Sequence, residues 1–303
     1  MMNLTDLQQK IIAFLPDSDV RFFEPMSKHT SFRIGGPAEV MVFPKNAEEL
    51  AQLLKLSKKL DCKFAILGAG TNILAPDAGL SGVVICLKDA LDSISLFDGN
   101  KLRVDAGVTM SRAAVYAAAA GLSGLEFAHG IPGTVGGGVY MNAGAYGGEI
   151  AMVCESVDVM SWDGQISTVA CEEMGFSYRH SRLEDEGGVV VSVVFKLTPK
   201  EEALIRGQMQ ELMQKRKASQ PLELPSAGSA FKRPVGGYAA ALIDQAGLKG
   251  YRIGGAAVSS KHAGFVVNVE NATAADVLAL LAYVADKVFD DSGIRLEPEI
   301  RLW

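Results

Sequence analysis

The chain has 303 residues, of which 49% are hydrophobic, and its formal net charge is −6 at pH 7. This length and apolar content suffice for two or three domains with buried cores. The negative charge and the lack of a long basic run argue against a nucleic acid as the main partner. The longest apolar stretches, near residues 113–120 and 189–194, are too short to span a membrane.

Four cysteines are scattered along the chain: Cys62, Cys86, Cys154 and Cys171. They form neither a C-x-x-C pair nor a metal-binding spacing, and are typical of small buried thiols in a reducing compartment. The first residues lack the charged, apolar and small-residue order of a signal peptide. We therefore expect a cytoplasmic protein that does not bind a membrane.

After an N-terminal helix, which belongs to the first lobe, a helix and two strands lie close together in the sequence. Asn46–Glu49 has the pattern of a capping box, and the leucines that follow predict an amphipathic helix over Asn46–Leu60. A strand at Lys63–Leu67, a loop at Gly68–Asn72 and a strand at Val83–Leu87 come next. The result is a small βαβ-like unit with a loop at the carboxyl end of a strand, where α/β sheets tend to bind ligands.

The same signals predict further elements along the chain. Up to residue 200 they are a strand at Leu102–Asp105, an alanine-rich helix at Met110–Ala120 ended by Gly121, a hairpin of Val153–Trp162 and Gln165–Val169 around Asp163–Gly164, and a buried strand at Val189–Leu197. After residue 200 the predicted elements are a polar helix at Glu201–Lys217, a proline-containing boundary segment at Gln220–Pro225, a short helix at Ala239–Ala246 and a strand at Phe265–Val269. A helix follows at Ala274–Asp290, capped by Thr273 and with Asp276 in its first turn. The tail at Ile294–Trp303 is strand-like. We expect an α+β fold with two ligand-binding lobes, residues 1–88 and 89–200, and a third domain over residues 201–303.

Glycine is unusually dense in His129–Glu149, which we expect to be a loop and where eight of the nineteen residues from Gly130 to Gly148 are glycine. An isolated glycine cluster is most often a turn. Such density instead suggests close approach of the main chain to a ligand, because bare N–H groups form concavities that suit a diphosphate. A shorter segment of this kind, LGAGTNIL, occupies Leu67–Leu74. Two such segments suggest one dinucleotide held by both.

Neither segment is a standard phosphate-binding fingerprint. In LGAGTNIL the third glycine position of the Rossmann pattern holds Ile73, and no acidic residue follows at the expected distance. The Gly-Lys-Ser/Thr sequence of a P-loop is also missing. The phosphates would therefore have to be neutralised by amides and hydroxyls, such as those of Thr71 and Thr134, and not by a lysine.

Three patches near the third domain carry reactive side chains: PSAGSAFKRP at Pro225–Pro234, FSYRHS at Phe176–Ser181, and EPEIR at Glu297–Arg301. The first of them is expected to place Ser229 in a loop of small residues. Taken singly, a serine is usually a turn residue, an arginine a surface group and a terminal glutamate a solvated one. Ser229 has no hydrolase elbow around it, so acyl chemistry is unsupported. The histidines at positions 129, 180 and 262 are too scattered to predict a metal site.

Six short motifs occur in a fixed order from about residue 29 to the last residue: SFRIGGPAE, LGAGTNIL, IPGTVGGGVYMNAGAYGGE, YRHS, PSAGSAFKRP and LEPEIR. In this order and at these separations, the chain resembles the UDP-N-acetylenolpyruvoylglucosamine reductases of peptidoglycan synthesis (the MurB family). The short link between Tyr178 and Val189 resembles the shorter second type, which lacks a tyrosine lid. Two alternatives stay open: a sugar or alcohol oxidase of the same FAD fold, and a noncatalytic nucleotide-sugar sensor.

The resemblance implies noncovalent FAD held in a two-lobed fold of the vanillyl-alcohol-oxidase (PCMH) type, with a third domain that covers the substrate. NADPH would reduce the flavin, and the enolpyruvyl ether of UDP-N-acetylglucosamine would receive the hydride. Arg179 and Glu299 would stabilise the developing charge, with Glu299 a better match to the family than Glu297. Ser229 would donate the proton, with Lys232 or a water as helper.

The resemblance also carries over binding residues by position. The expected FAD-binding residues are Leu67, Gly68, Ala69, Gly70, Thr71, Asn72, Ile73, Gly130, Ile131, Pro132, Gly133, Thr134, Gly136, Gly137, Asn142, Ala143 and Gly144. The expected substrate-binding residues are Lys217, Tyr178 and Lys232, with Arg216 as a competing assignment for the basic residue at the substrate diphosphate.

Overall fold

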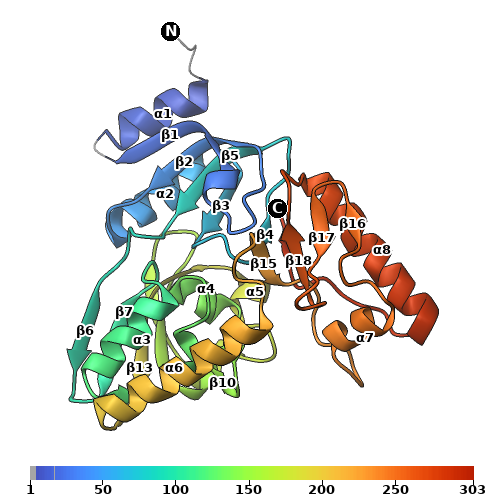
Figure 1. The fold of residues 1–303 in the computed structure, drawn as a ribbon. Helices are drawn as coiled ribbons and strands as arrows, with labels where there is room; N and C mark the ends of the chain where they lie inside the picture. The colour runs from blue at the N-terminus through green and yellow to red at the C-terminus, as the bar shows by residue number, and fades with distance from the viewer. Residues whose placement is uncertain (1–4, 17) are drawn as a thin grey trace. The chain divides into compact units, whose positions relative to one another are not determined.

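The computed structural model describes residues 5–16 and 18–303, and the chain forms two compact units (Figure 1). The first unit comprises the described residues up to Phe22, Val40–Ala69 and Gly82–Lys215, and the second comprises Phe23–Glu39, Gly70–Ser81 and Arg216–Trp303. Both units contain helices and strands, and most of the strand pairs are antiparallel, which confirms the predicted α+β class. The division into three domains stays a prediction.

The first unit contains most of a four-stranded sheet with the order β1-β2-β5-β3. Its strands are β1 Asp19–Pro25, β2 Pro37–Phe43, β5 Leu80–Cys86 and β3 Phe64–Leu67, and its helices are α1 Asp6–Phe14 and α2 Ala47–Lys59. As the sequence predicts, β3 and β5 are parallel, and the leucines of α2 pack on the sheet.

The capping box predicted at the start of α2 is only half formed. The side chain of Asn46 accepts a hydrogen bond from the Glu49 N–H at 2.9 Å, as expected of an N-cap residue. The Glu49 carboxylate does not return to Asn46, because it accepts from the Lys45 N–H at 2.8 Å and from the Ser18 hydroxyl at 2.9 Å. These two donors lie outside the helix and compete successfully for the carboxylate.

A second sheet of the first unit is antiparallel throughout and has the order β12-β11-β13-β7-β6. Its strands are β12 Ile166–Ala170, β11 Cys154–Met160, β13 Val189–Lys196, β7 Lys101–Asp105 and β6 Ile94–Phe97. The predicted hairpin is confirmed as β11 and β12. The predicted buried strand is β13, which lies at the centre of the sheet and has buried residues on both of its faces.

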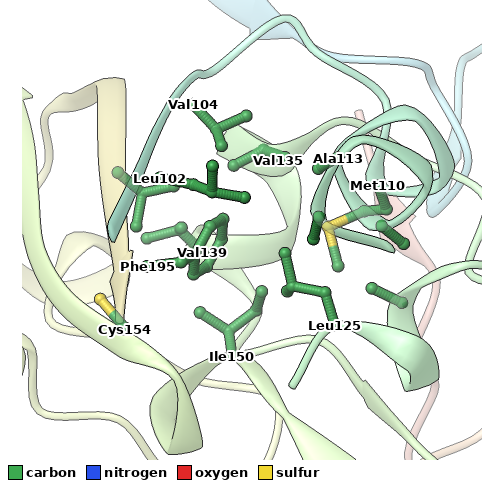
Figure 2. Packing of buried hydrophobic residues seen from close by; sticks show 14 of the residues in the cluster. Leu102, Val104, Met110, Ala113, Leu125, Val135, Val139, Ile150, Cys154 and Phe195 are labelled. Atoms are coloured by element: carbon green, nitrogen blue, oxygen red, sulfur yellow. The ribbon is translucent and has the colours of Figure 1, made fainter. Parts of the chain in front are cut away.

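The core of this part lies between the second sheet and two helices, α3 Met110–Ala119 and α4 Val135–Tyr140 (Figure 2). Phe195 of β13, Leu102 of β7 and Val139 of α4 are fully buried together. Ala113 and the other alanines of α3 have small side chains, so this helix can lie close to its neighbours in the core. Gly121 follows α3 with a φ of +67°, as predicted for a residue that ends a helix.

Helix α4 corrects the expectation that His129–Glu149 is entirely loop. Thr134 caps the helix through its side chain, which accepts from the Gly137 N–H. A Cβ on Gly136 would lie 2.8 Å from the Cβ of Ala106, and one on Gly138 would lie 2.8 Å from the sulfur of Met110. Close packing of a helix therefore explains part of the glycine density, independently of any ligand.

The remaining elements of the first unit are short, apart from the helix α6, whose last residues belong to the second unit. They are β8 Leu122–Ser123, β9 Gly144–Ala145, β10 Gly148–Glu149, β14 Thr198–Pro199, α5 Leu183–Glu186, α6 Glu202–Ser219, and the 3-10 helices η2 Glu126–Ala128, η3 Ile150–Met152 and η4 Cys171–Met174.

The second unit is built around the four-stranded sheet β15-β18-β17-β16, on which the long helix α8 packs (Figure 1). Its elements are η1 Met26–Lys28, β4 Ile73–Leu74, β15 Ser226–Ser229, α7 Ala239–Gln245, β16 Arg252–Ile253, β17 Ala256–Val258, β18 Phe265–Asn268, α8 Ala274–Ser292 and β19 Arg301–Leu302. The predicted cap of α8 is confirmed as a full capping box of Thr273 and Asp276.

Two expectations for the second unit are wrong. Ser229 does not lie in a loop but at the end of β15, which pairs with β18 through an irregular register. The tail Ile294–Trp303 is not one strand, because only β19 at Arg301–Leu302 forms a ladder, in parallel with β4. Before β19 the tail pairs with the chain after β15 through a bridge between Pro298 and Phe231.

Among the residues that the structure describes, no helix combines the length and the apolar character needed to cross a membrane.

Candidate active site

The two glycine segments meet within the first unit. Leu67 ends β3, and Gly68 follows it with its Cα against the side chain of Thr134. A Cβ on Gly68 would lie 2.5 Å from the Thr134 hydroxyl oxygen, which leaves no space for a side chain there. Segments that are more than sixty residues apart in the sequence are thus in contact, as a single ligand held by both would require.

The boundary between the units divides the first glycine segment. Leu67, Gly68 and Ala69 belong to the first unit, whereas Gly70 and the residues after it belong to the second. Gly70 has a φ of +60°, and a Cβ there would lie 2.0 Å from the carbonyl oxygen of His29. Packing against the main chain of His29 therefore accounts for Gly70 without a ligand.

Arg179 lies in a tight turn that contacts the second glycine segment. Ser177 and His180 pair across the turn, and their backbone hydrogen bonds are 3.1 Å and 3.2 Å long. Arg179 has a φ of +57°, a conformation that costs free energy for a residue with a side chain. One guanidinium nitrogen donates to the carbonyl oxygen of Gly144 at 3.5 Å. The guanidinium carbon also lies 5.3 Å from the ring centroid of Tyr178.

Asn142 connects the second glycine segment to this turn. Its side chain is 1% exposed, and its Nδ2 donates to the carbonyl oxygen of Ser177 at 3.1 Å. Its Oδ1 accepts from the N–H of Ala151 at 3.0 Å. Both polar atoms of the side chain thus bond to the protein main chain, a role that the sequence did not reveal.

Ser229 and Glu299 lie on adjacent stretches of chain in the second unit. The N–H of Glu299 donates to the carbonyl oxygen of Ala230, the residue after Ser229, at 2.9 Å. Phe231 and Pro298 form an isolated bridge one residue further along. Glu299 is 9% exposed, while the Ser229 side chain is exposed. The two motifs PSAGSAFKRP and LEPEIR are therefore paired by their main chains.

The first glycine segment also reaches this pair within the second unit. Nδ2 of Asn72 donates to the carbonyl oxygen of Glu299 at 3.2 Å, and the N–H of Arg301 donates to the carbonyl oxygen of Asn72 at 2.9 Å. Asn72 was expected to contact the cofactor. Its side-chain amide bonds to the main chain that carries Glu299, and the cofactor contact stays a prediction.

The candidate substrate-binding residues differ in burial. Lys217 is exposed near the end of α6, and its carbonyl oxygen accepts from Nζ of Lys261 at 2.7 Å. Arg216 is only 8% exposed. Lys232 is exposed and lies 3.5 Å from the carboxylate of Glu297. An exposed ammonium group can reach a ligand more readily than a buried guanidinium, which favours Lys217 over Arg216.

Burial disfavours the charged form of two histidines. The pKa of His129 and that of His262 are both lowered, mainly because burial disfavours the charged ring. Nδ1 of His262 accepts from the N–H of Gly264 at 3.1 Å, which requires that nitrogen to carry no proton. Within residues 5–16 and 18–303, no group of three or more His, Cys, Asp or Glu side chains is arranged to hold a metal ion.

A cavity of about 230 Å³ lies elsewhere in the first unit, beside the hairpin of β11 and β12. Its lining residues are Val159, Ser161, Trp162, Ser167, Val169, Arg182, Leu183, Glu186, Gly187 and Gly188. None of the candidate site residues is among them, so this cavity is separate from the proposed chemistry.

Comparisons with known proteins find similarity to the same family that the sequence motifs indicate. Residues 38–170 match the family model of an FAD binding domain, and residues 220–303 match the C-terminal domain of UDP-N-acetylenolpyruvoylglucosamine reductase. The UDP-N-acetylenolpyruvoylglucosamine reductase of Streptococcus pneumoniae (strain JJA) is 45% identical over 296 residues, which cover 98% of each chain. The protein of the same name from strain R6 is also 45% identical and is covered to 93% of its length.

A solved structure also resembles the chain over nearly its whole length. It is the UDP-N-acetylenolpyruvylglucosamine reductase of Thermus caldophilus, with a TM-score of 0.79, 36% sequence identity, and coverage of 94% of this chain and 98% of the other. Together with the FAD-binding domain, this similarity confirms the predicted α+β class, an FAD-binding fold followed by a C-terminal α+β domain.

Proposed function

Because the chain belongs to the UDP-N-acetylenolpyruvoylglucosamine reductase family, we propose that it reduces this enolpyruvyl nucleotide sugar to UDP-N-acetylmuramate for peptidoglycan synthesis. The chain is an oxidoreductase with an FAD-binding domain. NADPH provides the two electrons. In the net reaction a hydride adds to the methylene carbon of the enolpyruvyl group and a proton adds to the neighbouring carbon.

The residues of the first unit fit noncovalent FAD. The contact between Gly68 and Thr134 supports a diphosphate held by both glycine segments, and it is the observation that carries this assignment. Amide and hydroxyl donors suit the phosphate oxygens without a lysine. When bound, FAD supplies the hydride transfer that amino-acid side chains cannot perform.

Arg179 is proposed to bind the carboxylate of the enolpyruvyl group and to stabilise the negative charge that develops on it. A guanidinium stays charged at all relevant pH values and has a planar fork that matches a carboxylate. A preorganised donor of this kind contributes about 3–4 kcal/mol to the transition state. The turn of Ser177–His180 and the bond to Gly144 support such preorganisation, because they limit where the guanidinium can move.

Ser229 is proposed to donate the proton to the carbon next to the new C–H bond. Its hydroxyl is exposed at the end of β15, so a substrate can reach it. Glu299 would assist as a hydrogen-bonding acid on the developing charge, and its main-chain bond to Ala230 holds it on the stretch of chain next to Ser229. Lys232 lies three residues after the serine and is proposed to support its acidity.

The nucleotide part of the substrate needs a cation for its diphosphate. We assign Lys217 to this role in preference to Arg216, since the ammonium is exposed and the guanidinium is buried. Tyr178 is exposed beside Arg179 and is proposed to contact the substrate as well. Replacement of Lys217 by Met should raise the KM for the nucleotide sugar with little change in the rate of flavin reduction by NADPH.

The assignment of Ser229 is tested by separating the two half-reactions in a stopped-flow experiment. Ser229→Ala should be reduced by NADPH at about the wild-type rate, whereas reoxidation by the enolpyruvyl substrate should slow by at least about 100-fold, the usual worth of a general acid. Ser226→Ala, on the same strand, is the matched control and should behave like wild type. Equal slowing of both half-reactions in Ser229→Ala would refute the role given to this residue.

Three further measurements test the remaining parts of the proposal. Acid precipitation should leave the flavin in the supernatant, because its binding is noncovalent; yellow precipitate would contradict this. Turnover with NADPH and the enolpyruvyl substrate should proceed without oxygen, which an oxidase would not allow. We also propose a cytoplasmic location, in keeping with four free thiols, and cell fractionation would reveal any other.

A further inference from the structure

We propose that Asn142 and Ser181 are positioning residues that hold the turn carrying Arg179 against the second glycine segment. This inference rests on the proposed role of Arg179. It assigns to Asn142 a task different from the cofactor contact expected from its sequence position. All the residues concerned belong to the first unit.

The first observation is the burial of Asn142 with both of its polar atoms bonded. Its side chain is 1% exposed, and it bridges the carbonyl oxygen of Ser177 and the N–H of Ala151. A buried amide that loses either bond leaves a main-chain group without a partner, which is costly. Asn142 therefore fixes the distance between residue 142 and the first residue of the turn.

The second observation is a hydrogen bond that the turn donates to the glycine segment, whereas Asn142 donates from the glycine segment to the turn. The hydroxyl of Ser181, which is fully buried, donates to the carbonyl oxygen of Tyr140 at 2.8 Å. The Arg179 turn is therefore held at both ends: at Ser177 by a side chain of the glycine segment, and at Ser181 by its own side chain.

The third observation is the backbone conformation that these bonds enclose. Arg179 has a φ of +57° and Asn142 a φ of +41°, and neither is a glycine. Such conformations persist only where the surroundings impose them. Bonds at Ser177 and Ser181, together with the contact of the guanidinium with Gly144, provide that constraint. Loss of one bond should let the turn relax and carry the guanidinium away from its working position.

Asn142→Asp is the most informative variant because it changes one atom. The acceptor bond from the Ala151 N–H can remain, whereas the donor facing the Ser177 carbonyl becomes a second acceptor. A displacement of about 1 Å at a catalytic group can slow a reaction about 100-fold. We expect reoxidation by the enolpyruvyl substrate to slow by about 10- to 100-fold, while reduction by NADPH and the Kd for FAD stay within about twofold of wild type.

The matched control is Asn100→Asp. Nδ2 of Asn100 also donates to a main-chain carbonyl oxygen, that of Leu197, at 3.0 Å in the same unit. The chemical change is therefore the same, but the partner is not the Arg179 turn. This control should reoxidise at the wild-type rate. Ser181→Ala removes the other bond and should slow reoxidation by about 3- to 10-fold; it tests the proposal if Asn142→Asp does not fold.

A double-mutant cycle separates positioning from a general structural defect. In an Arg179→Ala background, Asn142→Asp should cause no further loss of the reoxidation rate, because the residue that it positions is missing. Losses that multiply would overturn the proposal, as would wild-type reoxidation in both Asn142→Asp and Ser181→Ala. Weaker FAD binding with normal reoxidation in Asn142→Asp would restore the cofactor role instead. Normal reoxidation in Arg179→Ala alone would refute the proposed function of that arginine.

Discussion

Gly70→Ala tests whether the glycines of LGAGTNIL serve the fold or the cofactor. Gly70 adopts a φ of +60°, and a Cβ there would lie 2.0 Å from the carbonyl oxygen of His29 and 3.0 Å from the Cα of Thr30. The N–H of Ser31 donates to the carbonyl oxygen of Gly70 at 3.0 Å, so the two segments cannot separate without losing a bond. The atoms in the way belong to the main chain, which has no rotamer to change.

Three free-energy contributions decide the outcome of Gly70→Ala. The left-handed conformation costs alanine about 1–2 kcal/mol relative to glycine. The reduced freedom of the unfolded chain offsets about 0.4–1 kcal/mol of that cost. Overlap with the main chain of His29 adds about 1–3 kcal/mol, as in other overpacked sites. We therefore expect Gly70→Ala to lower the free energy of unfolding by about 3 kcal/mol, within a range of about 1–5 kcal/mol.

Gly99→Ala isolates the contribution of the backbone conformation. Gly99 has a φ of +74°, and nothing lies within 4 Å of the position that an alanine methyl group would take there, so this variant should cost about 1 kcal/mol or less. Urea unfolding of both variants, with and without FAD, measures the difference. Equal stability losses at positions 70 and 99 would refute the packing explanation. A normal apoprotein with weakened FAD binding in Gly70→Ala would show that the glycine serves the cofactor.

Two further predictions concern pH and the core. Burial lowers the pKa of His262 below 6.5, so the folded protein binds fewer protons than the unfolded chain and loses stability as the pH falls through 6.5. Thermal unfolding should therefore be less sensitive to pH between 7.5 and 5.5 in His262→Asn, whose Oδ1 can still accept from Gly264; unchanged pH sensitivity would contradict this. Phe195→Ala should lower the free energy of unfolding by about 3–5 kcal/mol, since Phe195 is fully buried at the centre of its sheet. In urea unfolding, the control Lys196→Ala, at the exposed end of the same strand, should have nearly the wild-type free energy of unfolding. A loss of free energy in Phe195→Ala well below this range would contradict the prediction and would indicate that the core collapses around the cavity.

Local patterns in the sequence predicted most of the regular structure. The helix that begins at Ala274 was identified from Thr273 and Asp276 because a capping box involves residues only three positions apart. The hairpin of β11 and β12 was identified from the Asp163–Gly164 turn between two extended runs, and β13 from its continuous apolar composition. In each case the physical cause lies within a few residues of its effect.

The sequence predicted less well where the cause lies in a distant part of the chain. Glu49 has the right position for a capping box, but the Ser18 hydroxyl and the Lys45 N–H take its carboxylate. The tail before Arg301 has the composition of a strand, yet it finds a parallel partner only at β4. Competition among possible partners is resolved by the fold, and a single sequence does not identify the competitors.

The sequence by itself determined the elements, the fold class and the motifs that place the chain in its family. Only the tertiary structure decided what the glycines and asparagines do. Gly136 and Gly138 permit close helix packing, Gly68 meets Thr134, and the side chains of Asn72 and Asn142 bond to main-chain groups that are far away in the sequence. The physical reason is that the role of a glycine or an asparagine depends on which atoms the fold places next to it. A missing Cβ serves whichever atom approaches it, and an amide serves whichever donor or acceptor the fold brings within reach.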